Sequence, residues 1–391
     1  MDLDEIAKGT VEIIGKQELE QKLASGKKIR IKHGVDPNTT QLHLGYVVNY
    51  RVMRRFQDLG HTVVLLLGDF TGRIGDPTDK LEARQGLDKE ILRNNAETLI
   101  KVATKVLDKD KLEVRYNSEW WDEMKLDDFL KIAKGVSAVR LWERDMFEER
   151  LKQGKPVWTH EFLYPILQAH DSVELESDLT VIGSDQKFNE LLARELQKNA
   201  GQSLQSLIIM PILPGIDGKE KMSQSLNNGI GIDEKPSEIY GKIMSMPDKN
   251  ILPYFTLLTD ISEKEITMIK TEMLSGVRNP RDVKMRLARE IIKTLYAEEE
   301  AQLAEKSFKA IFQKKEDPEN IKTYNLEKEA FLLDVLVKTN LAPSRAEARR
   351  LIEQKAVKLG DKVIEDVMFK VEKKDCPIVL KKGKRFFVKI I

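Results

Sequence analysis

The sequence predicts a doubly wound α/β domain built on a parallel sheet, followed by an α-helical domain and a small α+β tail domain. Three observations lead to this prediction. They are a βαβ unit near the start of the chain, helical periodicity beyond the middle, and a helix followed by a hairpin near the end. With 391 residues, the chain is long enough for two or three domains, each with its own core.

The βαβ unit covers residues 29–67. An alternating run at 29–32 leads into a loop with Gly and Pro, and a continuous apolar run follows at 63–67, as in parallel strands buried on both faces. Between the two strands, His43 begins a helix that Gly60 closes. The side of this helix that we expect to face solvent carries Arg51, Arg54 and Arg55.

The helix of this unit begins with His43-Leu44-Gly45-Tyr46, at the end of the sheet where ligands bind in open α/β folds. A helix N-terminus offers free N–H groups to an anion, and an imidazole beside it can donate a hydrogen bond to a phosphate. Gly45 leaves room for a base or a ribose to approach the backbone. Taken alone, His43 is explained as well by a helix cap.

A second motif, Lys221-Met222-Ser223-Gln224-Ser225, lies in a polar loop bracketed by glycines. Lys219 and Lys221 can deliver positive charge to a pyrophosphate leaving group, whose charge grows in the transition state. A solvated surface loop is the alternative interpretation of this stretch. The two motifs together favour ATP-dependent activation of a carboxylic acid.

The two motifs resemble the HIGH and KMSKS signatures of the bacterial-type tyrosyl-tRNA synthetases, which are class I aminoacyl-tRNA synthetases. The resemblance covers nearly the whole chain, and further segments agree with the family in the same order. These segments are residues 68–77, 116–120, 161–171 and 183–189. The resemblance implies a Rossmann-like catalytic domain that activates L-tyrosine with ATP and transfers it to the 3' end of tRNA(Tyr).

The resemblance also implies roles for single residues. Those expected to bind tyrosine are Asp76, Tyr164, Gln168, Asp171 and Gln186. Those expected to bind ATP are Asp36, Asn38, His43, Gly183, Asp185, Lys219 and Lys221. Those expected to take part in catalysis are His43, Gly45, Tyr46, Lys221, Ser223 and Gln224. The spacing of Tyr164, Gln168 and Asp171 places them on one helix face, where they can line one pocket.

The sequence departs from the family pattern on both sides of the site. On the ATP side, Tyr46 stands in place of the second His of HIGH, Asn38 in place of Thr, and Gln224 in place of the second Lys of KMSKS. On the tyrosine side, His170 stands where many relatives carry Tyr. Lys32 or His33 falls where some relatives place a tyrosine that shares the substrate hydroxyl.

These departures keep two other interpretations open: a synthetase-like RNA-binding protein with an impaired ATP site, and a paralogue with altered amino-acid specificity. A dinucleotide-dependent oxidoreductase is disfavoured, because no GxGxxG follows the first strand.

The composition of the chain excludes several other classes of protein. The single Cys376 excludes an internal disulfide, and the five histidines form no HExxH pattern, so we expect no protein-bound metal and only magnesium that accompanies ATP. No charged leader with an apolar stretch and no apolar run of membrane-spanning length occurs. We therefore expect a cytoplasmic protein that binds neither a membrane nor DNA.

The charge is unevenly distributed. Residues 331–391 hold 15 Lys and Arg against 8 Asp and Glu, a net charge of +7, whereas the rest of the chain holds 50 against 56, a net of −6. A basic tail favours an anionic partner such as tRNA. Ser344 begins a helix there, and a hairpin turns at Gly360-Asp361, similar to the small RNA-binding domain at the end of many family members. The expected phosphate contacts are Arg345, Arg349, Arg350, Lys355, Lys358 and Lys362.

The predicted domain organisation has four parts. These are a catalytic domain at 1–231, an α-helical domain at 232–312 that meets the anticodon arm in the family, a polar linker at 313–330 and the tail at 331–391. The segment 118–180, inserted into the catalytic domain, forms the homodimer interface in the family. Its tryptophans fit that role if exposed, but they fit a core equally well. They are Trp120, Trp121, Trp142 and Trp158.

Overall fold

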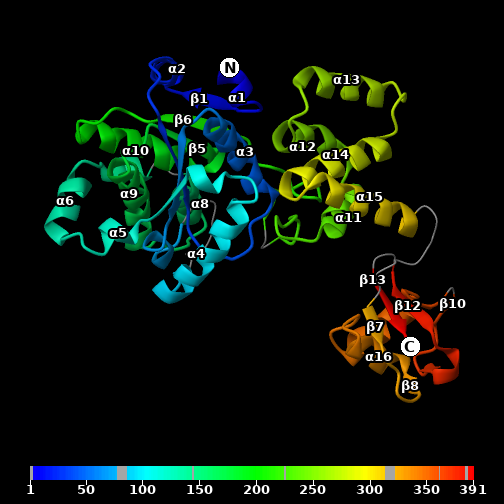
Figure 1. The fold of residues 1–391 in the computed structure, drawn as a ribbon. Coiled ribbons are helices and arrows are strands. Elements are labelled where there is room, and N and C mark those ends of the chain that lie inside the picture. Colours follow the sequence, from blue (N-terminus) through cyan, green and yellow to red (C-terminus); the bar gives the residue numbers. More distant parts are fainter. Residues whose placement is uncertain are drawn as a thin grey trace. The chain divides into compact units, whose positions relative to one another are not determined.

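The computed structural model describes most of the chain in two compact units, Met1–Ala301 and Gln302–Ile391 (Figure 1). The described ranges are residues 3–76, 86–142, 145–223, 226–312, 322–360, 362–383 and 386–391. Gln224 and Ser225 of the second sequence motif lie outside them, as do residues 313–321 of the predicted linker and Asp361 of the predicted hairpin turn.

The first unit is built on a six-stranded sheet with the order β1-β6-β5-β2-β3-β4. All neighbouring strands are parallel except β1, which pairs antiparallel with β6 at one edge. The strands are β1 (Glu12–Ile14), β2 (Arg30–Val35), β3 (Thr62–Leu67), β4 (Leu112–Tyr116), β5 (Leu179–Gly183) and β6 (Ser206–Met210).

The strand order reverses between β2 and β5. From β2 the chain proceeds to β3 and β4 on one side, whereas β5 and β6 extend the sheet on the other side. A crevice forms at such a switch point, outside the carboxyl ends of the two strands, and ligands bind there in open α/β sheets. The residues after Val35 and after Gly183 therefore border the expected ligand site.

The predicted βαβ unit is confirmed as β2, α3 (Leu44–Asp58) and β3, with His43 at the N-cap. One expectation for this helix is wrong. Arg51 does not face solvent but is only 5% exposed, and its guanidinium contacts the Asp260 carboxylate at 2.5 Å. Asp260 follows α12 (Ile251–Leu258), a helix that packs against α3, and the helical periodicity of α3 alone gave no sign of that neighbour.

The inserted segment between β4 and β5 is helical. Its tryptophans differ in exposure: Trp121 is 5% exposed and belongs to the core, whereas Trp142 and Trp158 are 44% and 53% exposed. The helices of this segment are α5 (Ser118–Trp121), α6 (Leu126–Lys134), α7 (Ala138–Trp142), α8 (Asp145–Lys152) and α9 (Thr159–Glu174). The other helices near the sheet are α1 (Leu3–Ile6), α2 (Lys16–Ala24), α4 (Lys89–Ala103) and α10 (Lys187–Asn199).

The stretch after β6 is mainly helical, as the periodicity predicts. Figure 1 shows α11 to α14 grouped beside α3, where α12 packs. The Lys105 ammonium fastens the start of this stretch, because it donates to the carbonyl of Ile232 and to the hydroxyl of Tyr296, both at 3.0 Å. The further helices are α11 (Pro236–Ser245), α13 (Glu263–Leu274), α14 (Pro280–Leu295) and α15 (Glu298–Phe312). Within the described ranges, no helix has both the length and the apolar composition that a membrane crossing requires.

The second unit packs two helices against a five-stranded sheet with the order β10-β9-β12-β13-β7. Ser344 caps α17, and β9 and β10 form the predicted hairpin. The tail fold begins before the predicted boundary at 331, because β7 pairs in parallel with β13 and Leu326 lies in the core. The elements are β7 (Lys322–Tyr324), β8 (Ala330–Phe331), α16 (Leu332–Lys338), α17 (Arg345–Glu353), β9 (Val357–Leu359), β10 (Lys362–Val363), β11 (Lys370–Val371), β12 (Ile378–Lys382) and β13 (Phe386–Ile390).

Candidate active site

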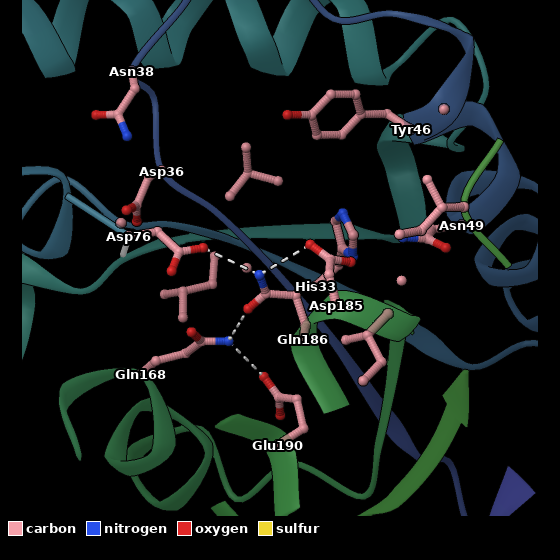
Figure 2. A pocket seen from close by; sticks show the side chains of 18 of the residues that line it. His33, Asp36, Asn38, Tyr46, Asn49, Asp76, Gln168, Asp185, Gln186 and Glu190 are labelled. Atoms are coloured by element: carbon pink, nitrogen blue, oxygen red, sulfur yellow. Dashed lines mark hydrogen bonds between the residues drawn. The ribbon is translucent and has the colours of Figure 1, made fainter. Parts of the chain in front are cut away.

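A cavity of about 340 Å³ opens at the switch point between β2 and β5 (Figure 2). Segments far apart in the sequence line it, and most residues that the sequence analysis assigned to tyrosine, ATP or catalysis meet there. Those that line it are Asp36, Asn38, His43, Gly45, Tyr46, Asp76, Tyr164, Gln168, Asp171, Gly183, Asp185, Gln186, Lys221 and Ser223. Lys219 is exposed on the loop and does not line the cavity.

The first part of the site is the carboxylate of Asp36, which follows β2. It accepts hydrogen bonds from the hydroxyls of Thr71 at 2.7 Å and Tyr164 at 2.9 Å. The pKa of Asp36 is raised to about 7, mainly by burial and also by the nearby carboxylates of Asp76 and Asp171, while the hydrogen bonds from the two hydroxyls oppose the shift. Since the Tyr164 proton is committed to Asp36, the phenol oxygen presents lone pairs to any other donor.

The second part is Asp171 on α9, which is 3% exposed. Its Oδ1 accepts from the indole N–H groups of Trp120 at 2.9 Å and Trp121 at 2.8 Å, and its Oδ2 accepts from the Asn117 amide at 3.1 Å. Burial raises the pKa of Asp171 to about 7, whereas the three N–H donors and the positive charge of Lys32 lower it. The result is an acceptor fixed in position inside the cavity.

The residues beside Asp171 were only partly anticipated. Residues 116–120 match a family segment in the sequence, but no contact with Asp171 was expected of Asn117, Trp120 or Trp121. A positional signal existed for Asn117, because it follows β4 and the carboxyl ends of parallel strands meet at one edge of the sheet. The side chain of His170 does not line the cavity. Its Nε2 lies 3.0 Å from Oε1 of Glu174, and its ring lies against Trp121.

The third part is the N-terminus of α3. Nδ1 of His43 accepts a hydrogen bond from the backbone N–H of Gly45 at 3.2 Å, and burial lowers the pKa of His43 to about 4. A neutral imidazole that accepts through Nδ1 carries its proton on Nε2, so that nitrogen is a donor. A side chain at position 45 would have its Cβ 2.8 Å from the His43 ring, so glycine is required beside the imidazole. The Tyr46 ring lies 5.0 Å from that of His43.

The two sequence motifs are joined through the backbone. His43 forms an isolated antiparallel bridge with Gly231, and the N–H of Leu44 donates to the carbonyl of Ile230 at 2.9 Å. Lys221 pairs in the same way with Pro214 on the other side of its loop. The loop that carries Lys221 is therefore held against the start of α3, although almost 180 residues separate the motifs in the sequence.

Asn228 holds this loop in shape and was missed by the sequence analysis. Its Oδ1 accepts from the backbone N–H of Ser223 at 2.8 Å, and its Nδ2 donates to the carbonyl of Lys221 at 3.0 Å and to Asp217 at 3.1 Å. Asn228 is 4% exposed, and a Cβ at Gly215 would lie 2.2 Å from its amide nitrogen. A single asparagine in a polar loop carries no sequence signal for such a role.

Lys32 and His33 both line the cavity but differ in their partners. Lys32 pairs with the buried carboxylate of Glu190, whereas Nδ1 of His33 lies 3.0 Å from the carbonyl of Val181. Nε2 of His33 is buried without a partner, and burial lowers the pKa of this imidazole. Among the described residues, no group of three or more His, Cys, Asp and Glu side chains is arranged to hold a metal ion.

The basic residues predicted to contact RNA lie in the second unit, on α17 and the β9–β10 hairpin or beside them. Three of them form surface ion pairs: Arg345 with Asp334, Arg350 with Glu347, and Lys355 with Glu365. Such exposed pairs contribute little to stability. Arg349 and Lys358 are exposed.

Comparison with known proteins agrees with this fold. The family model described as tRNA synthetases class I (W and Y) matches residues 24–313, and the chain belongs to this family. Residues 313–390 match the model of the tyrosine–tRNA ligase SYY-like C-terminal domain.

Among curated relatives, the tyrosine–tRNA ligase of Thermotoga maritima is 44% identical over 385 residues, which cover 98% of this chain and 96% of the relative. That of Idiomarina loihiensis is 45% identical over 389 residues, covering 99% and 96%. A solved structure, tyrosyl-tRNA synthetase from Archaeoglobus fulgidus complexed with L-tyrosine, is similar in fold. It has a TM-score of 0.62 and 24% identity, and the match covers 78% of this chain and 98% of that one.

Proposed function

We propose that this protein is a tyrosine–tRNA ligase. It activates L-tyrosine with ATP to form tyrosyl-adenylate and transfers the tyrosyl group to the 3' end of tRNA(Tyr). The observation that carries the proposal is that one cavity is lined both by the buried acceptor Asp171 and by the donors His43 and Lys221. A substrate that has both a hydroxyl and a reacting carboxylate suits that combination of side chains.

Tyrosine is held by acceptors suited to its two ends. Asp171 accepts the hydrogen bond of the substrate phenol. Asp76, Tyr164 and Gln168 accept the protons of its ammonium group. Gln186 steadies the tyrosine carboxyl group, since its amide lies between Asp76 and Asp185, at 3.1 and 3.3 Å from their oxygens. Phenylalanine would leave Asp171 without the phenol donor in a buried site, so the pocket rejects it; tyrosyl-tRNA synthetases are themselves a well-known example of this kind of selectivity.

ATP binds on the side of Gln186 opposite to tyrosine. Asp185 binds the ribose, and Gly183 permits this because a Cβ there would lie 2.5 Å from the Asp185 carboxylate. The Nε2–H of His43, the N-terminus of α3 and the Lys221 ammonium face the phosphates. Asn38 and Ser223 line the same region. Magnesium enters as the counterion of the ATP substrate.

The first reaction step needs no nucleophile from the protein. The tyrosine carboxylate attacks the α-phosphorus of ATP, and a new O–P bond forms as the bond to the bridging oxygen breaks and pyrophosphate leaves. The protein positions the two reactants and stabilises the charge that grows on the leaving group. In the second step, a hydroxyl of the terminal adenosine of tRNA attacks the adenylate carbonyl, and AMP leaves.

The remaining parts of the chain have supporting roles in this proposal. The catalytic part covers residues 1–231, and the helical part at 232–312 meets the anticodon arm. The basic tail binds the tRNA backbone. Two copies associate through the segment 118–180, and exposed apolar side chains there support this. They are Leu126, Val139, Trp142 and Trp158. The enzyme works in the cytoplasm.

The test is pyrophosphate exchange with ATP and each of the twenty amino acids. We expect exchange with tyrosine alone. Exchange with no amino acid would instead support an RNA-binding protein with an impaired ATP site, and exchange with another aromatic amino acid would support altered specificity. Changing Gln224→Lys tests the ATP side separately. A large gain in exchange would mean that Gln224 limits the reaction, and no gain would mean that the remaining lysines suffice.

A further inference from the structure

A buried ion pair lies beneath the candidate tyrosine site, and the catalytic proposal does not use it. The Lys32 ammonium lies 3.0 Å from each carboxylate oxygen of Glu190, and both residues are only 2% exposed. Lys32 also donates to the hydroxyl of Ser172 at 2.5 Å. Both side chains line the cavity, which places this pair of charges in contact with the substrate site.

Glu190 is connected to the substrate site through a chain of amides (Figure 2). Its Oε1 accepts from the Gln168 amide at 3.1 Å, and the same Gln168 nitrogen donates to Oε1 of Gln186 at 3.2 Å. The Gln186 nitrogen then donates to Asp76 and Asp185. Glu190 therefore reaches the residues proposed to hold tyrosine and ATP through two glutamines, although it has no substrate role of its own.

The direction of these hydrogen bonds is set by chemistry. An amide offers an oxygen that accepts and a nitrogen that donates, and its partners decide which way it points. An ionised carboxylate only accepts. Glu190 therefore makes Gln168 turn its nitrogen inward, and Asp76 and Asp185 make Gln186 turn its nitrogen toward them. The hydrogen bonds of Asn189 are consistent with both amide orientations, because its nitrogen donates to the oxygens of Gln168 at 2.7 Å and Gln186 at 3.1 Å.

This arrangement of hydrogen bonds leaves the side-chain oxygen of Gln168 free to accept from the substrate. With its nitrogen held by Glu190 and Gln186, Oε1 accepts one hydrogen bond from Asn189 and retains a second lone pair. That lone pair is what an ammonium group needs. If Gln168 were reversed, its NH₂ group would face the NH₂ group of Asn189 and the substrate ammonium. Donors would then face donors, and the ammonium group would bind more weakly.

We propose that Glu190 is a positioning residue that sets the amide orientation of Gln168 and thereby the affinity for the ammonium group of tyrosine. Lys32 supplies the opposite charge that lets a carboxylate remain buried at this place. Glu190 touches no reacting atom, so its effect appears in substrate binding. This inference rests on the proposed function, because the ammonium group belongs to the proposed substrate.

The test compares two double variants that carry no charge at the pair. In Lys32→Met with Glu190→Gln, the new amide offers its oxygen to Gln168 and its NH₂ group to Gln205. Gln205 can turn to accept it, because its own Oε1 is buried without a partner. In Lys32→Met with Glu190→Leu, the charge change is the same, but Gln168 loses its inner acceptor. The two variants therefore differ in the acceptor for Gln168 and in the partner of Gln205, and the second difference has its own control.

We expect the leucine variant to have a tyrosine KM about tenfold above that of the glutamine variant, the effect of about one buried hydrogen bond. The KM for ATP should be equal in the two variants. Urea unfolding of both checks that each is folded, which we expect because a neutral pair of similar volume replaces a buried ion pair with little loss. The control is Gln205→Met, which removes the 2.8 Å donor to the other Glu190 oxygen and leaves Gln168 untouched, so the tyrosine KM should not change.

Equal tyrosine KM values in the two folded double variants would overturn the inference, whether both are normal or both are raised. Both values normal would mean that the pair has no influence on the substrate, and both raised would mean that the charge, not the acceptor, matters. Failure of the proposed function is recognised separately, as an absence of tyrosine-dependent pyrophosphate exchange in the unaltered chain.

Discussion

The hydroxyl of Tyr164 donates a hydrogen bond to Oδ2 of Asp36 at 2.9 Å, although the two residues lie 128 positions apart. This contact joins α9, which carries the proposed tyrosine acceptors, to the segment after β2, which leads to the proposed ATP site. Asp36 therefore contacts one of the proposed acceptors for the tyrosine ammonium, and the carboxylates of Asp76 and Asp171 are close enough to raise its pKa. We expect the protonation state of Asp36 to affect tyrosine binding.

The first prediction concerns pH. The pKa of Asp36 is raised to about 7, so the free protein holds a proton there below that pH. The substrate ammonium favours the ionised form, so tyrosine binding expels the proton, and affinity rises as the pH rises. The groups that face Asp36 are Thr71, Asp76, Tyr164 and Asp171, and Asp171 also titrates near pH 7. We expect the tyrosine KM in pyrophosphate exchange to fall about tenfold from pH 6 to pH 8.

Two variants identify the titrating group. Asp36→Asn raises the KM at every pH and should flatten its pH dependence, because the amide has no proton to lose in this range. If the slope survives in Asp36→Asn and disappears in Asp171→Asn, the titrating group is Asp171. A KM that does not change with pH in the unaltered chain would contradict the prediction.

The second prediction concerns Trp121. Changing Trp121→Phe keeps an aromatic ring but removes one of the three N–H donors to Asp171, which makes the carboxylate a poorer partner for the phenol. We expect kcat/KM for tyrosine to fall about fivefold, while the KM for ATP stays unchanged. Trp142→Phe is the matched control, because it removes an indole that packs against Phe147 and Phe162 and keeps an aromatic ring on the proposed dimer surface. A KM for ATP that rises as well would point to a packing defect instead.

The third prediction concerns Asn228. Changing Asn228→Ala removes the contacts that hold the backbone of Lys221 and Ser223. We expect the rate of pyrophosphate exchange to fall by about 10- to 100-fold with a raised KM for ATP, because Lys221 acts on the leaving group. Tyrosine binding, measured by calorimetry without ATP, should stay unchanged.

A control for the loop is Asn227→Gly. Asn227 has a φ of 51°, which glycine adopts without strain, and its change leaves the Asn228 contacts in place. Exchange should therefore remain normal. If Asn228→Ala weakens tyrosine binding as much as it slows exchange, the residue supports the whole cavity and not the loop alone.

The fourth prediction concerns the tail. Changing Arg349→Ala and Arg350→Ala together should weaken tRNA binding and reduce the slope of log affinity against log salt by about 2, because each arginine is expected to neutralise about one phosphate. Pyrophosphate exchange should stay unchanged. The control is Lys373→Ala with Lys374→Ala, two exposed lysines that belong to neither α17 nor the hairpin, which lowers the net charge equally. An equal loss of tRNA binding and of exchange would contradict this division of labour.

Much of this structure could be predicted because local patterns decide it. The alternation at 29–32, the apolar run at 63–67 and the cap at His43 each follow from backbone geometry and burial, and each was found where expected. Ser344 at the start of α17 is a similar case. Arg51 was predicted wrongly, because burial of a charged residue depends on a partner, Asp260, that lies more than 200 positions away.

The sequence by itself determined the βαβ unit, the basic tail, and the two motifs with the acceptors between them, because periodicity, charge and motif spacing are local properties. Only the tertiary structure decided which way each polar group points. Tyr164 donates to Asp36, three N–H groups donate to Asp171, and the Gln168 amide donates to Glu190. The physical reason is that a buried polar group needs a hydrogen-bond partner close to it in space. The distance between two residues along the chain does not identify that partner.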